Sequence, residues 1–345
     1  MPELFLPSIF LIRRRGWHPD QLAPTFWPGG FDPARGHLYQ DAPGVSPAVT
    51  PGDRVGLVHA QLDASQASPD ASPRVNRGPP GGRRNMLLHS EDFGDPAWAG
   101  YFVKPARSVS PDSLSDASAT QRLVYDPSAH ESHFSGVFFN PTEAPAGVWS
   151  YRLKFRFADR IPAVVRIGMD DGLSGAQTLN GQSIAPDGDN LAALLSVGVV
   201  YTLEGRAATA GSVNGRALQI YFQDEVSDEI ATFDIAEVQS EPGNEPTGYQ
   251  RVGSAHDVVE PGAREVWHLS DDGGASLSVV FPAATYTRAF VDALGAVTIE
   301  SDVSIGGMQD VLRADRLADV LYVARTLTAA EVTRLIHYWQ RRYSA

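Results

Sequence analysis

The chain has 345 residues and contains no cysteine. Disulfides, thiolate nucleophiles and cysteine-ligated zinc sites are therefore excluded together. The sequence also lacks a Walker loop and a Gly-x-Ser-x-Gly elbow, the signatures of nucleotide binding and of a serine hydrolase. We expect no cofactor and a protein that is not an enzyme. A fold without cross-links depends on the burial of apolar surface, which a chain of this length can supply.

Positive charge is scarce. There are 28 Lys and Arg residues against 41 Asp and Glu residues, which gives a formal net charge of −13. A duplex-binding protein needs a basic face that releases counterions, and no long basic stripe is present. An acidic surface also disfavours adsorption to anionic membranes. We therefore expect neither nucleic acid nor a membrane as a partner.

Long apolar runs are missing as well. The run Leu4–Ile12 is interrupted by Pro7, and nine residues are too few to span a bilayer. Three arginines follow this run, whereas a signal peptide places its basic residues first, so we expect cytoplasmic synthesis without a signal peptide. The apolar tip either packs onto its own domain or docks into a partner subunit or particle. Its docking candidates are Leu4, Phe5, Ile9, Phe10 and Leu11.

The N-terminal part, residues 1–84, is rich in proline and has no sustained periodicity. His37–Gln40 and Val55–Val58 are short strand candidates, and Ala64–Gly82 has the composition of a linker. Proline removes a backbone donor and restricts its neighbour. We therefore predict an extended arm and linker, which docks on a particle or in an oligomer.

Strand patterns dominate from residue 85 onward. Ser150–Phe157 alternates, with aromatic and aliphatic residues on one face and basic residues on the other. Further short apolar runs are separated by turn-formers such as Asn214-Gly215, a strong hairpin signal. The pattern predicts an all-β protein with a jelly-roll β-sandwich over residues 85–252. A single short helical turn is expected within Asp189–Ser196.

A smaller β-rich domain is expected over residues 253–345, ending in one α-helix over 328–342. Thr328 and Glu331 fit a capping box, in which each side chain satisfies a backbone donor of the other residue. Leu335 and Trp339 belong to the apolar stripe that follows. At about 93 residues, this part is either a truncated sandwich or one that N-terminal strands complete.

Aromatic residues are the strongest binding candidates, because sugar rings present apolar C–H groups that stack on flat aromatic faces. Aromatics also commonly fill the core of a sandwich, which is the alternative interpretation of each of them. The candidates for a glycan-binding face are Trp98, Tyr101, Tyr125, Trp149 and Tyr201.

A weak calcium hypothesis applies to Asp187, Asp189 and Asn190, whose oxygen ligands crowd around Gly188. A plain solvated turn is the competing interpretation, and no other metal site is expected. Pairs of adjacent carboxylates leave a glycosidase open only by their number.

The segment Asn85–Phe93 (NMLLHSEDF), followed by Trp98, resembles a motif of phage and prophage virion proteins that opens a jelly roll similar to carbohydrate-binding modules. Phe233–Gly253 resembles the closing strand, acidic turn and Tyr-x-Arg-Val exit of the same domain. Phe31–Gly56 resembles the N-terminal region of such fibre proteins. Asp319–Leu335 is similar to the end of laminin-G-like sandwiches.

The resemblance implies a surface protein of a tailed phage or a phage-like gene transfer agent: a head spike, head fibre or tail fibre. Its implied partners are other virion proteins at a capsid vertex or tail baseplate, further copies of itself, and host surface polysaccharide. Its implied location is the surface of the particle. Two alternatives remain open: a capsule depolymerase or glycosidase, and a ligand-free decoration or adaptor protein.

Overall fold

The computed structural model describes residues 17–41, 43–59, 64–67, 72–80, 82–139, 147–170, 175–184, 189–209, 216–270 and 275–344. The fold is all-β with one α-helix near the C-terminus, as the sequence predicts. The strands are β1 (Leu38–Tyr39), β2 (Leu57–His59), β3 (Ala64–Ala67), β4 (Arg74–Gly78), β5 (Trp98–Phe102), β6 (Ala106–Val109), β7 (Gln121–Tyr125), β8 (Phe134–Phe139), β9 (Gly147–Phe157), β10 (Val164–Asp170), β11 (Gln177–Leu179), β12 (Gln182–Ser183), β13 (Tyr201–Thr209), β14 (Arg216–Gln223), β15 (Ala231–Pro242), β16 (Arg251–Ser254), β17 (Asp257–Val259), β18 (Val266–Ser270), β19 (Leu277–Asp292), β20 (Val297–Asp310) and β21 (Arg316–Val323). The helices are α1 (Ala329–Tyr343) and the 3-10 helices η1 (Pro19–Leu22), η2 (Pro33–Arg35), η3 (Pro127–Ala129) and η4 (Ala192–Leu194).

The chain divides into two compact units that alternate along the sequence. The first consists of Met1–Ala48, Arg54–Pro73 and His268–Ser344, and the second consists essentially of Val49–Asp53 and Arg74–Trp267. Three consecutive segments, 1–84, 85–252 and 253–345, were expected instead. The difference arises because N-terminal residues build one unit together with C-terminal residues.

In the first unit, N-terminal strands extend the C-terminal sheet. Strands β1, β2 and β3 lie in sequence beside β19, which is followed by β21 and β18, while β20 pairs with β19. The linker expected over residues 64–82 therefore contains sheet strands, β3 here and β4 in the second unit. Of the two forms considered for the C-terminal part, the structure has the one completed by N-terminal strands.

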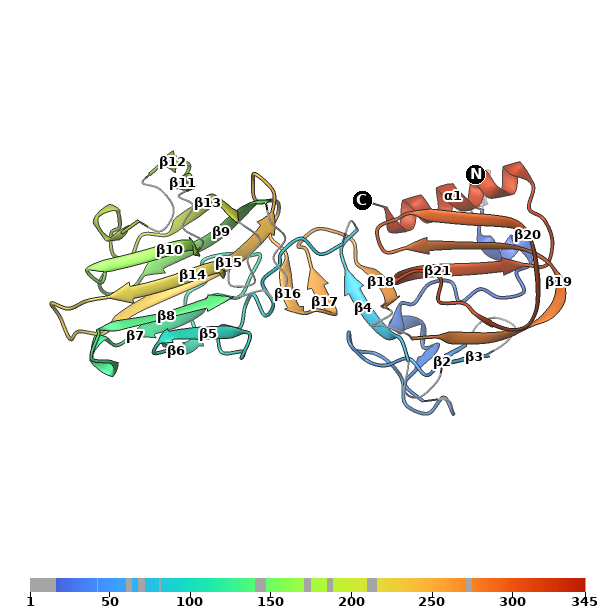
Figure 1. The fold of residues 1–345 in the computed structure, drawn as a ribbon, viewed down its shortest axis with the longest axis horizontal. Helices are drawn as coiled ribbons and strands as arrows, with labels where there is room; N and C mark the ends of the chain where they lie inside the picture. The colour runs from blue at the N-terminus through green and yellow to red at the C-terminus, as the bar shows by residue number, and fades with distance from the viewer. Residues whose placement is uncertain are drawn as a thin grey trace, which may run out of the picture. The chain divides into compact units, whose positions relative to one another are not determined.

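A buried carboxylate fastens the two chain ends of this unit. Asp319 of β21 accepts hydrogen bonds from Trp27 Nε1 (3.1 Å), the Gly30 amide (2.9 Å) and Trp339 Nε1 (3.0 Å). Burial raises the pKa of the Asp319 carboxyl. One side chain thus connects the N-terminal segment with helix α1, which lies beside β19, β20 and β21 in Figure 1.

The structure confirms the predicted C-terminal helix, α1, with its capping box and its buried stripe. The Thr328 hydroxyl accepts from the Glu331 amide, and the Glu331 carboxylate accepts from the Thr328 amide at 2.8 Å. Leu335, Trp339 and Tyr343 are its buried residues. The expected helical turn near residue 192 is also present, as η4.

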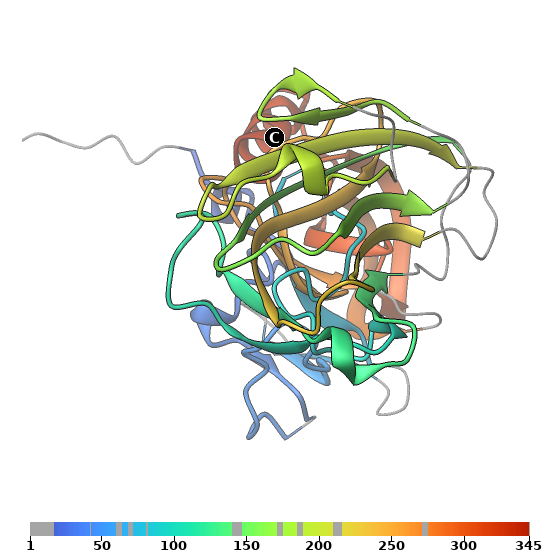
Figure 2. The same ribbon diagram turned by 90° about the vertical axis from the view of Figure 1, so that its left-hand side faces the viewer.

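The second unit contains the jelly-roll β-sandwich. Its larger sheet has the order β12-β11-β13-β9-β15-β7-β6, and its smaller sheet has the order β10-β14-β8-β5. In Figure 1 the smaller sheet lies in front of β9, β13 and β15, and Figure 2 shows the same strands from the side. Strands β4, β16 and β17 form a short ladder that also belongs to this unit.

Aromatic rings fill the space between the two sheets. Phe222 of the smaller sheet meets Phe233 of the larger sheet with ring centroids 5.1 Å apart, and Phe157 contacts both rings. Strand β9 shows the alternation expected for Ser150–Phe157: its aromatic and aliphatic residues are buried and its basic residues are half-exposed. Each sheet therefore has one face in the core and one outer face.

Candidate functional site

Four of the five aromatic residues predicted to bind glycan lie in the core. Trp98 and Trp149 are 1% exposed, Tyr125 is fully buried, and Tyr201 is 8% exposed. Trp98 packs on Phe93, and its indole N–H donates to the backbone carbonyls of Leu88 and His89. A ring enclosed in this way cannot stack on a sugar, so these four predictions are corrected to core positions.

Two of the corrected residues also use their hydroxyl groups internally. Tyr125 Oη donates to the His133 carbonyl at 2.6 Å, and burial raises its pKa to about 12. Tyr201 Oη accepts from the Ser196 amide at 2.9 Å. The fifth candidate, Tyr101, has its Cα opposite Gly136 in the sheet, and its side chain lies outside the described residues.

The predicted docking and calcium residues fall largely outside the described part of the chain. This applies to Leu4, Phe5, Ile9, Phe10 and Leu11 and to Asp187. Asn190 is described, and its side chain bonds the backbone of Val165, Ala192 and Ala163. Within the described ranges no group of three or more acidic or histidine side chains could hold a metal.

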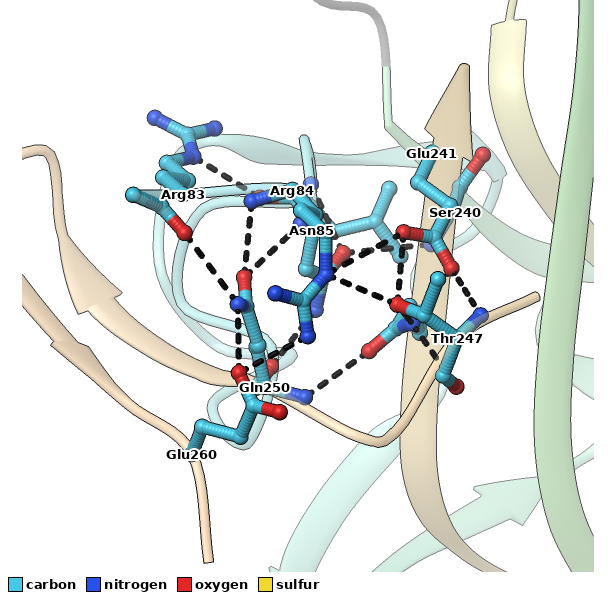
Figure 3. Close-up of polar contacts among 11 residues, drawn as sticks. Arg83, Arg84, Asn85, Ser240, Glu241, Thr247, Gln250 and Glu260 are labelled. Atoms are coloured by element: carbon cyan, nitrogen blue, oxygen red, sulfur yellow. Dashed lines mark hydrogen bonds and ion pairs between the residues drawn. The ribbon is translucent and has the colours of Figure 1, made fainter. Parts of the chain in front are cut away.

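The segment that resembles a virion motif proves to be a structural clasp. Asn85 is fully buried; its Nδ2 donates to the carbonyls of Val238 (3.1 Å) and Gln250 (2.9 Å), and its Oδ1 accepts from the Ser240 amide. Gln250 Oε1 in turn accepts from the backbone amides of Arg84 and Asn85 (Figure 3). The start of the domain is thereby fixed to its end.

Polar contacts extend this clasp on both sides. Arg84 reaches Glu260 at 2.7 Å and Thr247 Oγ1 at 2.9 Å (Figure 3). Further along, the Ser90 amide donates to the Val252 carbonyl, and the Val252 amide donates to Ser90 Oγ. The opening and closing motifs of the predicted jelly roll, about 165 residues apart in sequence, are thus partners in space.

The outer face of the larger sheet carries a ladder of ion pairs. Asp234 of β15 is fully buried and lies between Arg122 (2.7 Å) and Arg156. Asp112, on the segment before β7, adds a second carboxylate to Arg156 at 2.7 Å. These four charged side chains on the polar face are engaged with one another.

A β-bulge adds a second acid to this ladder. The pairing of β15 with β9 shifts register between Ala236 and Gln239, and Glu237 has a positive φ of 51°. The Glu237 carboxylate accepts from Lys154 Nζ at 2.7 Å and from the Ser115 hydroxyl. Both carboxylates, Asp234 and Glu237, therefore form ion pairs with basic side chains.

The protonation of this pair is the opposite of what glycosidase catalysis needs. Burial raises the pKa of both carboxyls, but hydrogen bonds from Arg122 and Arg156 to Asp234, and from Lys154 and Ser115 to Glu237, hold each net pKa below its ordinary value. A general acid has to keep its proton near neutral pH. Neither carboxyl suits that role.

The outer face of the smaller sheet carries a row of rings instead. Phe102 of β5 lies 5.6 Å from Phe134 of β8, which lies 5.8 Å from Tyr221 of β14, measured between ring centroids. The Arg166 guanidinium of β10 lies over the Tyr221 ring at 5.5 Å, and His130 lies 5.1 Å from Phe102. We call these five residues the aromatic row.

Strand register explains why the row exists. In β8, Val137 and Phe139 face the core, so Phe134 and Phe138 fall on the outer side. Tyr221 pairs with Gly136, where a Cβ atom would lie 2.7 Å from Tyr221 Cβ and 2.5 Å from the Ile220 carbonyl oxygen. Glycine is required there because the neighbouring strand approaches so closely.

The exposed end of the row is held in an unusual conformation. Phe102 is 62% exposed and has a φ of 55°, a left-handed value that is a genuine outlier for a bulky residue. Strained residues of this kind cluster at binding sites, where the surrounding structure maintains them. Phe134 is half-buried, and Tyr221, 9% exposed, forms the base between Phe134 and Arg166.

Sequence reasoning missed this row as a site. Five aromatic candidates came from the sequence, and none of the aromatic residues in the row was among them. The usable signal was the sequence FSGVFF (residues 134–139), which places aromatics on both faces of one strand. A half-buried strand should show aromatics on a single face.

Comparisons with known proteins give only weak likenesses. No family model matches the chain, and no curated protein matches it. Among solved structures, the tripod from the baseplate of bacteriophage Tuc2009 aligns over 74% of this chain and 98% of its own, at 9% identity and a TM-score of 0.30.

Two further solved structures match at a similar level. The N-terminal CBM22 tandem domain of Paenibacillus barcinonensis Xyn10C covers 72% of this chain and 91% of its own, at 12% identity and a TM-score of 0.29. The adhesin domain of Epf from Streptococcus pyogenes covers 75% and 90%, at 10% identity and a TM-score of 0.24. Likenesses at these scores carry no function over to this chain. Among the described residues, no helix is long and apolar enough to cross a bilayer.

Proposed function

We propose that this chain is a non-enzymatic subunit on the surface of a phage-like particle, and that its jelly roll binds host surface polysaccharide. The observation that carries the binding part is the aromatic row. The row places the exposed ring of Phe102 and the half-buried ring of Phe134 on an outer sheet face. Phe102 is held there with a left-handed φ.

The dimensions of the row suit an extended ligand. The row crosses four neighbouring strands, which corresponds to about 14 Å at the usual strand spacing of about 4.8 Å. That length exceeds a single sugar ring and fits several units of a polysaccharide. Apolar ring faces supply stacking surface, while His130 and Arg166 at the ends supply polar groups.

The particle context is supported by the sequence motifs and by the way the structure uses them. Asn85 and Gln250, which belong to the opening and closing motifs, hold each other in the clasp. The finer assignments proposed with this function are a head spike or a head or tail fibre of a phage or gene transfer agent, docked at a capsid vertex or tail baseplate as a homo-oligomer. Repetition of a weak site on one particle raises its avidity.

The experiment is an array of bacterial surface polysaccharides probed with the purified full chain and with a Phe102→Ala/Phe134→Ala variant. We expect the wild type to bind a subset and the variant to lose at least about 30-fold in affinity, as for central contacts of a binding site. Val109→Ala is the matched control, because Val109 is 73% exposed and lies on the larger sheet.

Two further measurements complete the test. The single variant Phe102→Ala removes a mostly exposed ring and should leave the thermal midpoint unchanged while weakening binding. Particles that lack the protein should adsorb less to host cells. A blank array together with unchanged adsorption would refute the proposal.

A further inference from the structure

The aromatic row ends in Arg166, a cation for which the described residues supply no ion pair. Arg166 is exposed, and none of the ion pairs found among the described residues involves it. Its cross-strand partner is Tyr221, and the next outward positions on β10 are Val164 and Gly168. No charged side chain therefore flanks it along its strand or directly across the sheet.

This arrangement differs from that of the three arginines in the ion-pair ladder of the other outer face. Arg122, Arg152 and Arg156 each face a carboxylate there. Acidic residues outnumber basic ones by 41 to 28 in the chain, so carboxylates are available for pairing. The row nevertheless ends in a cation that meets solvent.

The guanidinium of Arg166 is also held in place. It lies over the Tyr221 ring, and Tyr221 packs against Phe134. An arginine stacked in this way keeps its N–H groups free at the edge of the planar fork. Such a fork bonds an oxyanion through two parallel hydrogen bonds.

We propose that the aromatic row selects an acidic polysaccharide, with Arg166 binding an oxyanion carried by the sugar chain: a uronic acid carboxylate, or a sulfate or phosphate ester. This inference rests on the proposed function, since it specifies the ligand of the same site. An acidic ligand meets a protein surface that is negative overall, and the exposed cation beside the rings offsets that repulsion where stacking occurs.

The test compares each array polysaccharide that the wild type binds with its chemically neutralised form. Carboxyl reduction removes uronic acid charge, solvolysis removes sulfate esters, and hydrofluoric acid treatment removes phosphate esters. We expect one of these treatments to lower wild-type binding about tenfold, the size of a lost charge-assisted contact. The treatment that does so identifies the anion.

Variants assign the effect to one side chain. Arg166→Gln should lower affinity for the untreated polysaccharide about tenfold and leave affinity for the neutralised form unchanged. Arg166→Lys keeps the charge but loses the planar fork, and should fall between the two. Arg206→Gln is the matched control, because Arg206 is exposed on β13 of the other sheet and its loss changes net charge equally.

The outcomes separate the two proposals. If neutralised polysaccharides bind as well as native ones, or if Arg166→Gln and Arg206→Gln behave alike, the acidic-ligand inference is overturned while polysaccharide binding stands. If the wild type binds no polysaccharide at all, both fail. Thermal midpoints of all three arginine variants within about a degree of the wild type show that folding is not the cause.

Discussion

The two outer faces of the sandwich use their side chains in different ways. On the larger sheet, Asp234 and Glu237 are bound to arginines, a lysine and a serine, and both acids are almost fully buried. On the smaller sheet, Phe102 is mostly exposed and Arg166 meets no carboxylate among the described residues. The first face holds its two acids in ion pairs, and the other presents apolar and cationic groups to a ligand.

The difference separates stabilising residues from binding residues. A face rich in charge resembles a binding surface in sequence, yet bound charges have little left to offer a partner. Rings on an outer face do little for stability and much for recognition. Substitutions on the two faces should therefore affect different measurements.

The largest expected effect on stability comes from the ionic face. Asp234→Asn removes the carboxylate that lies between Arg122 and Arg156, and should lower the free energy of unfolding by about 2–3 kcal/mol. This lies at or below the lower end of the range for a buried charge that loses its partner, because both arginines reach solvent. Chemical denaturation of the full chain measures it.

Polysaccharide affinity provides the control for that variant. At a temperature where Asp234→Asn remains folded, its affinity should equal that of the wild type. A loss of affinity as large as that of Phe102→Ala/Phe134→Ala would place the ligand on the ionic face and break the comparison.

A smaller effect is expected at Gly136, beneath the aromatic row. Gly136→Ala would place a Cβ atom 2.5 Å from the Ile220 carbonyl oxygen, so strands β8 and β14 must separate. We expect a loss of about 1–2 kcal/mol in unfolding free energy, as for an overpacked site. Because Tyr221 moves with its strand, affinity should fall as well, unlike in Asp234→Asn. Unchanged affinity in a folded Gly136→Ala variant would show that ligand binding does not depend on the position of Tyr221.

The smallest effect is a difference in pH dependence. Asp234 and Glu237 have lowered pKa values in the folded state, so the unfolded chain binds more protons on acidification. Their contribution is fully present above the ordinary carboxyl pKa of about 4, and is lost as pH falls through the lowered values. Thermal midpoints from pH 6 to pH 3 should therefore fall less steeply in Asp234→Asn than in the wild type. Equal slopes would show that the ion pairs of Asp234 do not contribute to the loss of stability at low pH.

Much of the fold could be predicted from local patterns. Residues 152–157 of strand β9 alternate between half-exposed and buried positions, and helix α1 has its cap and stripe in adjacent residues, so neighbouring positions carried the signal. The union of N-terminal and C-terminal strands in one unit could not be predicted in the same way. It depends on contacts such as Trp27 to Asp319, which are 292 positions apart and leave no local period.

The sequence predicted a candidate site made of aromatic residues of the jelly roll, but four of the five aromatic residues it named lie in the core. The expectation that aromatics of the jelly roll bind glycan included Trp98 and Trp149, but large rings are also the residues that a sandwich core commonly buries. The face of each ring depends on strand register, which pairing partners fix. Phe134 became a candidate only once that register was known. Phe102 pairs with the buried Ser135, so its exposed ring depends on its left-handed φ and not on register.

A structure of the full chain with a bound oligosaccharide, taken from a polysaccharide that the array identifies, tests the central claim most directly. We predict sugar rings on Phe102 and Phe134, with an anionic group of the ligand hydrogen-bonded to Arg166. Sugar bound over Arg152 and Lys154 on the larger sheet, with the aromatic row bare, would contradict the account.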